Sequence, residues 1–144
     1  CSPNPIPTRR SNVAESGYSG TPQLAKLGVK AGTRFDVVGA ASGWWFSEST
    51  DAAERVPDGA ADVILAFVTT PAELRQRVES LEQRIRPNGA LWIAWPRKAA
   101  GHVSEVTENL IRDVVLPRGL VDVKVAAIDA DWSGLKVVWR LENR

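Results

Sequence analysis

The chain has 144 residues, of which 44% are apolar and 24% charged, and its formal net charge is +1. This length and composition fit one folded domain with a single core. A charge balance so close to zero gives no general attraction to nucleic acid or to an anionic membrane surface. No apolar run approaches the roughly 20 residues of a membrane-spanning helix. The composition therefore predicts no nucleic-acid partner and no membrane partner.

One cysteine, Cys1, and one histidine, His102, limit the chemistry further. A single cysteine excludes an internal disulfide and a thiolate zinc site. A histidine-dependent triad would have to use His102, and no nucleophile motif lies around it. We therefore assign no catalytic residue and no metal ligand. Because the sequence carries no secreted-protein signature, we expect a cytoplasmic location.

Residues 1–20 have the pattern of a flexible N-terminal tail. Pro3, Pro5 and Pro7 favour extended backbone, and the polar residues after them show no periodicity. Regular patterns begin at Thr21. We therefore expect a single domain over residues 21–144.

The first elements alternate between helix and strand. Thr21 and Pro22 are typical of a helix start, and this helix ends at Gly28. A strand is predicted over residues 34–39, followed by a loop of small residues at 39–43. We expect a short helix over residues 47–56.

The middle of the chain shows the clearest patterns. Residues 62–68 form a continuous apolar run, which is typical of a strand buried on both faces in a parallel sheet. The residues Thr70-Pro71-Ala72-Glu73 form a capping box, and an apolar stripe at helical spacing continues to Ile85. Residues 90–95 then form a third predicted strand.

The last elements predict how the sheet is completed. We expect a helix over residues 104–116, a strand over 121–128, a turn over 129–134 and a final strand over 135–141. The turn is too short for a crossover connection, so the last two strands must be antiparallel.

This order predicts an α/β three-layer sandwich of the Rossmann-like kind. Alternating strands and helices form right-handed parallel units. The sheet should have five strands, mainly parallel, with one antiparallel strand. Because the last strand is strongly apolar, we place it inside the sheet, which gives the strand order 1-2-3-5-4.

Two sequence segments carry a resemblance to a known family. Residues 62–66, and residues 86–93 after the intervening helix, resemble the latter half of class I S-adenosylmethionine-dependent methyltransferases. The resemblance covers about residues 33–141. It implies the same fold, with the last strand inserted between its neighbours. It also implies a glycine loop beside the cofactor after the first strand, and an acidic residue for the ribose at the end of the next strand.

Three other motifs resemble a family of small bacterial proteins that is catalogued only as a domain of unknown function. They lie at residues 17–22, 95–98 and 132–136 and span nearly the whole chain. This resemblance supports the fold and implies no activity.

The candidate ligand-binding residues all follow the carboxyl ends of predicted strands. Ligands bind there in open α/β sheets. Two cations among them would suit a carboxylate or phosphate. The set comprises Gly39, Ser42 and Gly43 in the glycine loop, Thr69 after the second predicted strand, Arg97 and Lys98 after the third, and Trp132 in the last turn.

The cofactor expectation depends on residues 44–61. In the resembled family this interval carries further strands and the ribose-binding acid, and the 18 residues present here cannot hold them. Glu48 and Asp51 are poorly placed as substitutes. We therefore expect no cofactor, with S-adenosylmethionine as the alternative.

Two functional interpretations follow. The first is a non-catalytic module that binds a small anionic ligand or a protein partner, and the alternative is a minimal S-adenosylmethionine-dependent methyltransferase. Trp44, Trp45 and Trp132 belong to loops, where they either pack or form an interface. The second possibility makes a homo-oligomer an open expectation.

Overall fold

The computed structural model describes residues 22–97 and 104–144. The predicted tail at residues 1–20, together with Lys98 and His102, lies outside these ranges. Among the described residues, no helix has the length and apolar content that crossing a membrane requires.

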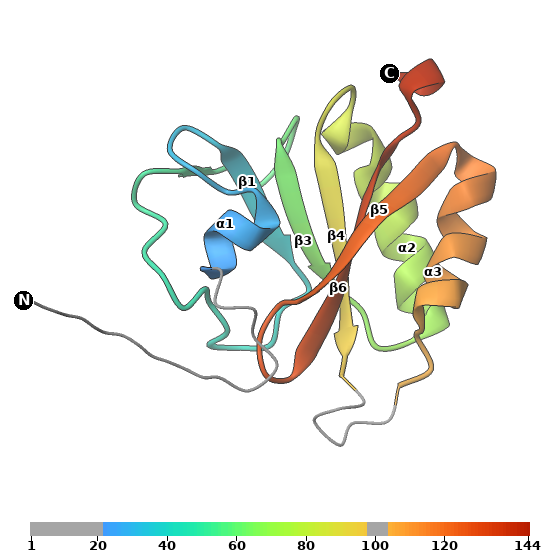
Figure 1. Ribbon diagram of the computed structural model, residues 1–144, viewed down its shortest axis with the longest axis horizontal. Coiled ribbons are helices and arrows are strands. Elements are labelled where there is room, and N and C mark those ends of the chain that lie inside the picture. The colour runs from blue at the N-terminus through green and yellow to red at the C-terminus, as the bar shows by residue number, and fades with distance from the viewer. Residues whose placement is uncertain (1–21, 98–103) are drawn as a thin grey trace, which may run out of the picture.

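One sheet organises the described chain, and its strand order is β2-β1-β3-β4-β6-β5 (Figure 1). Neighbouring strands from β2 to β4 are parallel, whereas β6 is antiparallel to β4 and to β5. The strands are β1 (Arg34–Val38), β2 (Glu54–Arg55), β3 (Val63–Phe67), β4 (Ala90–Pro96), β5 (Leu120–Ala127) and β6 (Trp132–Trp139).

This topology confirms the predicted α/β Rossmann-like fold. The five predicted strands stand in the predicted order, because β6 lies between β4 and β5. The reason is visible in its burial. Leu135, Val137 and Trp139 are 0–3% exposed and join the main core, so this strand needs a neighbour on each side. The sheet differs from the prediction by one additional strand, β2, outside β1.

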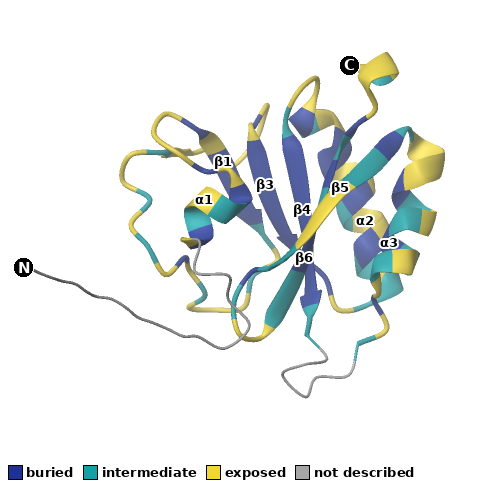
Figure 2. Ribbon diagram, viewed as in Figure 1, coloured by how far each residue is buried: buried dark blue, intermediate teal, exposed yellow. Residues whose placement is uncertain are grey.

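Helices cover both faces of the sheet, which makes three layers (Figure 1). The short helix α1 (Gln23–Leu27) lies on one face, and α2 (Pro71–Leu81) and α3 (Glu108–Val115) pack on the other. Figure 2 shows β3 and β4 buried along their lengths between these layers. Short 3₁₀ turns complete the described chain: η2 (Glu82–Ile85), η4 (Leu116–Arg118) and η5 (Leu141–Asn143).

The two long helices begin where side chains cap them. At α2 the Thr70 hydroxyl accepts a hydrogen bond from the backbone N–H of Glu73 at 3.1 Å, as the capping box predicts. At α3 the cap is Thr107, so the helix starts later than the predicted residue 104. The Ser104 hydroxyl instead hydrogen-bonds to the backbone of Val106, which competes with helix formation.

The predicted helix over residues 47–56 is wrong, and so is the expectation of no strand there. Residues 54–55 form β2 beside β1, because the N–H groups of Glu54 and Val56 donate to the carbonyls of Thr33 and Phe35. Gln23 of α1 accepts a hydrogen bond from the backbone N–H of Ser47 at 2.8 Å. Hydrogen bonds to residues distant in the sequence therefore determine the structure of this segment, in place of the helix that the local pattern predicts.

The predicted turn over residues 129–134 is too long. β6 begins at Trp132, and Gly134 already pairs with Ala94 inside the sheet. A Cβ on Gly134 would lie 2.6 Å from Cδ1 of Ile128 and 3.1 Å from the Trp92 ring. The glycine therefore permits close packing within a strand rather than a turn.

Candidate functional site

The sheet has a crevice where its strand order reverses. The connection from β1 leads to β2 on one side, while the connection from β3 leads through α2 to β4 on the other. The carboxyl ends of β1 and β3 meet at this switch point, where open α/β sheets bind ligands. Gly39 follows β1 and Thr69 follows β3 shortly before α2. Two predicted site residues therefore lie at the fold's natural binding position.

Arg77 from α2 closes one side of this crevice. A Cβ on Gly39 would lie 2.7 Å from its Nη2 and 3.1 Å from its Nε, and 2.9 Å from the carbonyl oxygen of Phe67. Gly39 also has φ +76°, which glycine adopts without strain. The Nε of Arg77 is buried and makes no hydrogen bond within the described structure. An unsatisfied, charged donor therefore stands at the mouth of the switch point.

Sequence reasoning missed Arg77. In the helical pattern it forms a favourable spacing with Glu73, which is typical of a solvated surface pair. Only the packing of α2 on the sheet brings its guanidinium to Gly39. The glycine at the end of the first predicted strand was the one related signal in the sequence.

Glu73 orders the start of α2 at the same crevice. Its carboxylate accepts hydrogen bonds from the backbone N–H of Thr69 at 2.8 Å and from the Thr69 hydroxyl at 2.7 Å. The Thr69 hydroxyl is the largest cause that lowers the pKa of Glu73, followed by the Thr69 backbone N–H. Thr69 is thus held by Glu73 and does not point freely at a ligand.

The loop after β1 leaves space beside Gly43. This residue has φ +83°, and a Cβ there would meet no atom within 4 Å. Ser42 is exposed next to it. The loop can therefore accept a ligand against its backbone at Gly43, whereas the space beside Gly39 is filled by Arg77.

Aromatic side chains pack beneath this loop. Trp44 lies edge-on to Phe67 with ring centroids 4.8 Å apart, and Trp132 contacts Phe67 at the same distance. Trp44 and Trp132 therefore form part of the folded interior. Trp45 is 43% exposed and lies 5.4 Å beneath the guanidinium carbon of Arg55.

Asp129 fastens the β5–β6 turn to this aromatic group. Its carboxylate accepts from Trp44 Nε1 at 2.9 Å and from the backbone N–H groups of Asp131 and Trp132. Its carbonyl oxygen accepts from Arg97 Nη1 at 3.2 Å. Arg97 and Trp132 lie at the predicted edge of the sheet, and both brace this turn. Whether they contact a ligand stays a prediction, and Lys98 lies outside the described residues.

A hollow of about 320 Å³ adjoins Arg97 on the α3 side of the sheet. It lies between the end of β4 and the start of α3, and its lining includes Trp95, Thr107 and Val125. It lies at the carboxyl end of β4, the strand that neighbours β3. The hollow therefore offers a second chamber at the same edge.

A buried carboxylate in β1 that was not singled out in the sequence pairs with two arginines. Asp36 in β1 accepts a hydrogen bond from Arg84 Nη1 at 2.8 Å and forms an ion pair with Arg55 Nε at 3.3 Å. Arg84 also donates to the carbonyl oxygens of Gly59 and Val56. This network joins β1, β2 and η2, so its role is structural. An aspartate inside an apolar strand is the signal that predicts such a network.

The site residues fit one end of an S-adenosylmethionine molecule. The unsatisfied Nε of Arg77 and the open backbone at Gly43 suit an amino-acid carboxylate beside the glycine loop. The residue at the carboxyl end of β2, where the ribose-binding acid is expected, is Arg55, which donates to Asp36 and to the carbonyl oxygen of Val37. Glu48 accepts the N–H of Leu24 at the start of α1. Across the described ranges, no group of three metal-ligating side chains gathers.

No protein-family model and no curated protein matches this chain. Solved structures do match its fold. An S-adenosylmethionine-dependent methyltransferase from Aquifex aeolicus matches with a TM-score of 0.56 and 13% identity, over 79% of this chain and 86% of that one. A putative type 11 methyltransferase from Sulfolobus solfataricus gives 0.54 and 12%, over 81% and 89%. Fibrillarin from Aeropyrum pernix, with natively bound S-adenosyl-L-methionine, gives 0.52 and 17%, over 81% and 73%.

These matches bear on the two interpretations of the sequence. They show the Rossmann-like fold of class I methyltransferases, and the resemblance to the small bacterial family has no matching family model. The prediction of a non-catalytic module is contradicted, because two of the matching structures named above are methyltransferases and the third holds S-adenosyl-L-methionine. The expectation of no cofactor loses its support for the same reason. Its premise, that residues 44–61 cannot hold the further strands of the resembled family, fails in part, since the two-residue strand β2 lies in that interval.

Proposed function

We propose that this protein is an S-adenosylmethionine-dependent methyltransferase. The observation that carries the proposal is the buried, unsatisfied Nε of Arg77 against Gly39 at the switch point of the sheet. A buried charged donor without an acceptor costs free energy, which a bound carboxylate would recover. The fold of the matching methyltransferases supports the same assignment.

Each part of the site has a distinct role in this proposal. Arg77 binds the carboxylate of the methionine moiety, and the backbone at Gly43 approaches the same end of the molecule. When bound, S-adenosylmethionine supplies an activated methyl group on its sulfonium. The chain's own contribution is to hold the acceptor in line with that methyl group and to exclude water. The hollow beside Arg97 is the chamber we assign to the acceptor.

Titration calorimetry with S-adenosylmethionine and S-adenosylhomocysteine tests the proposal. The wild-type protein should bind one of them with a micromolar dissociation constant. Arg77→Gln removes a charge-assisted hydrogen bond worth about 1.5–3 kcal/mol, so affinity should fall by roughly 10- to 150-fold. Arg75→Gln is the matched control, because Arg75 is exposed on the same helix. Absence of binding at millimolar ligand overturns the proposal, as does equal loss in both variants.

Two finer assignments accompany this proposal. Membership in the small bacterial family rests on the motifs at residues 17–22, 95–98 and 132–136. The cytoplasmic location rests on the sequence pattern alone. Both stay predictions.

A further inference from the structure

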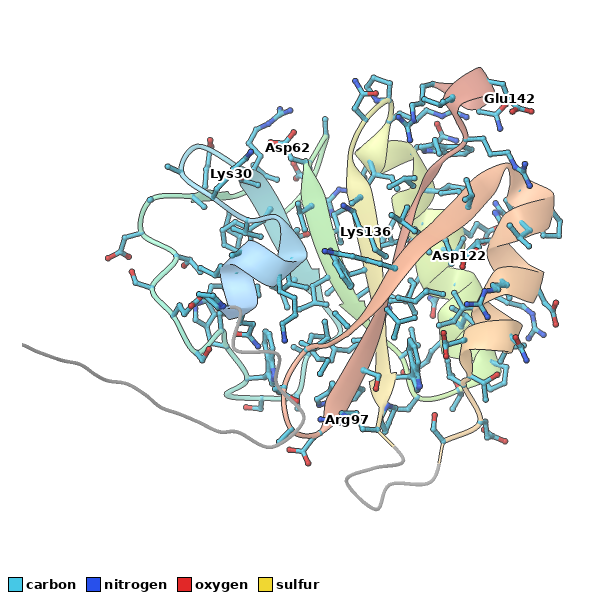
Figure 3. All side chains as sticks on the ribbon, viewed as in Figure 1. Lys30, Asp62, Arg97, Asp122, Lys136 and Glu142 are labelled. Carbon is cyan, nitrogen blue, oxygen red and sulfur yellow. The ribbon has the colours of Figure 1, made fainter. Side chains whose placement is uncertain are left out.

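One face of β5 and β6 has no helix packed on it among the described elements. Side chains alternate between the two faces along β6, and Leu135, Val137 and Trp139 point toward α2 and α3. Lys124 and Lys136 therefore lie on the opposite face, the one that carries α1. Figure 3 shows Lys136 in the middle of this face. We call it the lysine face, defined by Lys26, Lys30, Lys124 and Lys136.

The strand register brings two of these lysines together. Lys124 of β5 pairs directly with Lys136 of β6, and Lys136 pairs with Trp92 of β4. The ammonium of Lys124 reaches back over the Trp92 ring, at 5.8 Å from its centroid. Like charges placed directly opposite each other destabilise an antiparallel pair. The fold thus maintains an arrangement that costs stability.

Lys26 extends the positive charge toward the carboxyl end of the sheet, where Arg97 lies. Lys26 donates to the carbonyl oxygen of Ala127 at the end of β5. Burial is the largest cause that lowers the pKa of Lys26, followed by the charges of Arg97 and Lys124. Burial and then the charge of Lys124 lower the pKa of Lys136. Cations therefore act on one another across this face.

Lys30 continues the charge toward the opposite end. Together with Lys136 and Asp62 it lines a hollow of about 380 Å³ beside the end of α1, and Asp62 is already paired with Arg34. Figure 3 shows Lys30 near one end of the strands, Lys136 in the middle and Arg97 near the other end. A strand rises about 3.3 Å per residue, so the seven residues of β4 span about 23 Å. The cations form an extended row, which a single small anion would not fill.

Several charges elsewhere on the described surface are paired. Arg34 meets Asp62, Arg112 meets Glu108 and Asp122, and Arg118 meets Glu82. By contrast, no carboxylate in the described ranges forms an ion pair with Lys124 or Lys136. A net charge close to zero is therefore compatible with a local excess of positive charge around these two lysines. The sequence could not show it, because the lysines stand at positions 26, 30, 124 and 136.

We propose that the lysine face binds the phosphodiester backbone of a nucleic acid strand. An extended row of flexible, point-like ammonium groups suits a polymer with one negative charge at each nucleotide. Bases have no open aromatic platform here, since Trp92 is fully buried under the lysines. Binding should therefore depend on charge and salt and show little base preference. The proposal departs from the expectation, drawn from net charge alone, that nucleic acid is not a partner.

Fluorescence anisotropy with a labelled single-stranded oligouridylate tests the proposal on the full chain, without any cofactor. Binding should weaken as salt rises, with a slope of about −0.7 per phosphate contact in a plot of log affinity against log salt. Lys124→Gln and Lys136→Gln should each reduce the slope by about 0.7. Arg75→Gln, on the outer side of α2, should leave both affinity and slope unchanged. Circular dichroism establishes that each variant is folded.

Three outcomes overturn the proposal. The wild-type protein does not bind the oligouridylate at low salt, or Arg75→Gln weakens binding as much as the lysine variants do. In the third outcome, polyglutamate binds more tightly than the oligouridylate with the same lysine dependence, which identifies an acidic protein segment as the partner. None of these results bears on cofactor binding, so the lysine face and the methyltransferase assignment fail or stand separately.

Discussion

The guanidinium of Arg77 lies against the backbone of Gly39, so close that a Cβ on Gly39 would stand 2.7 Å from Nη2. This contact joins α2 to the end of β1 across the crevice between β1 and β3. Two observations explain why a glycine stands here: the contact leaves no space for a Cβ, and Gly39 has φ +76°. Stability and cofactor binding should therefore both respond to a change at this position.

Gly39→Ala should destabilise the protein and weaken binding of S-adenosylmethionine. The new Cβ would also meet the Phe67 carbonyl oxygen at 2.9 Å, and backbone cannot move as a side chain can. Strain at a positive φ costs about 1–3 kcal/mol, and the steric conflict adds to it. Urea unfolding measures the loss.

Gly43→Ala is the matched control for this change. Gly43 has φ +83° and open space where a Cβ would lie, so only the backbone strain applies. We expect it to lose less stability than Gly39→Ala. Equal losses in the two variants would show that the contact with Arg77 has no energetic effect.

Asp36→Ala should be far more destabilising than an exposed charge deletion. Asp36 is 4% exposed, and its removal leaves Arg84, whose side chain is 15% exposed, without a carboxylate partner. Breaking a buried ion pair in this way costs about 3–5 kcal/mol. Thermal unfolding should show a large fall in the melting temperature.

Asp62→Ala provides the comparison. Both side chains of the Arg34–Asp62 pair are 49% exposed, so its loss should cost no more than about 1 kcal/mol. If both aspartate variants lose similar stability, the network of Asp36 does not hold β1, β2 and η2 together.

Much of the architecture was predictable because local and long-range preferences agree there. The capping box at Thr70 and the apolar run of β3 each specify one structure. β2 was not predictable, because two residues become a strand only through the carbonyls of Thr33 and Phe35. The positions of Gly39 and Thr69 follow from the sheet, whereas Arg77 reaches the crevice only through the packing of α2. Candidate residues on strand ends are thus easier to predict than those supplied by helices.

Acid should reveal the contribution of Glu73 to stability. Its ordinary pKa is 4.5, and the hydroxyl and N–H of Thr69 lower it in the folded protein. A lowered carboxyl pKa adds stability above the ordinary value, and that stability is lost as pH falls through the folded pKa. Glu73→Gln should therefore be less stable than wild type at neutral pH, by at most about 1 kcal/mol because solvent screens the group. The difference should close in acid.

Thr69→Val separates the two donors to Glu73. It removes the hydroxyl and keeps the backbone N–H, so part of the pH-dependent difference should persist. Urea unfolding at several pH values provides the measurement. A difference between wild type and Glu73→Gln that does not change with pH would contradict the assigned cause.

Removing one charge from the lysine face should stabilise the protein. Lys136→Met keeps an apolar stem of similar length and eliminates the repulsion from Lys124 directly opposite on β5. Like-charged cross-strand pairs cost about 0.2–1 kcal/mol, and the free energy of unfolding should rise by that amount at low salt. Lys136→Arg, which keeps the charge, should not show this gain.

Salt and pH identify the electrostatic origin of that gain. Raising salt from about 0.01 M to about 1 M shortens the screening length from about 30 Å to about 3 Å, so the gain should shrink. The pKa of Lys136 is lowered in the folded state, so the unfolded chain binds more protons and wild-type stability rises with pH through the lowered pKa. The gain from Lys136→Met should therefore also shrink in alkali. Urea unfolding across the salt and pH series measures this gain. If Lys136→Met is less stable than wild type at every salt concentration, Lys136 stabilises the fold. The electrostatic cost that argues for a bound polyanion would then be absent.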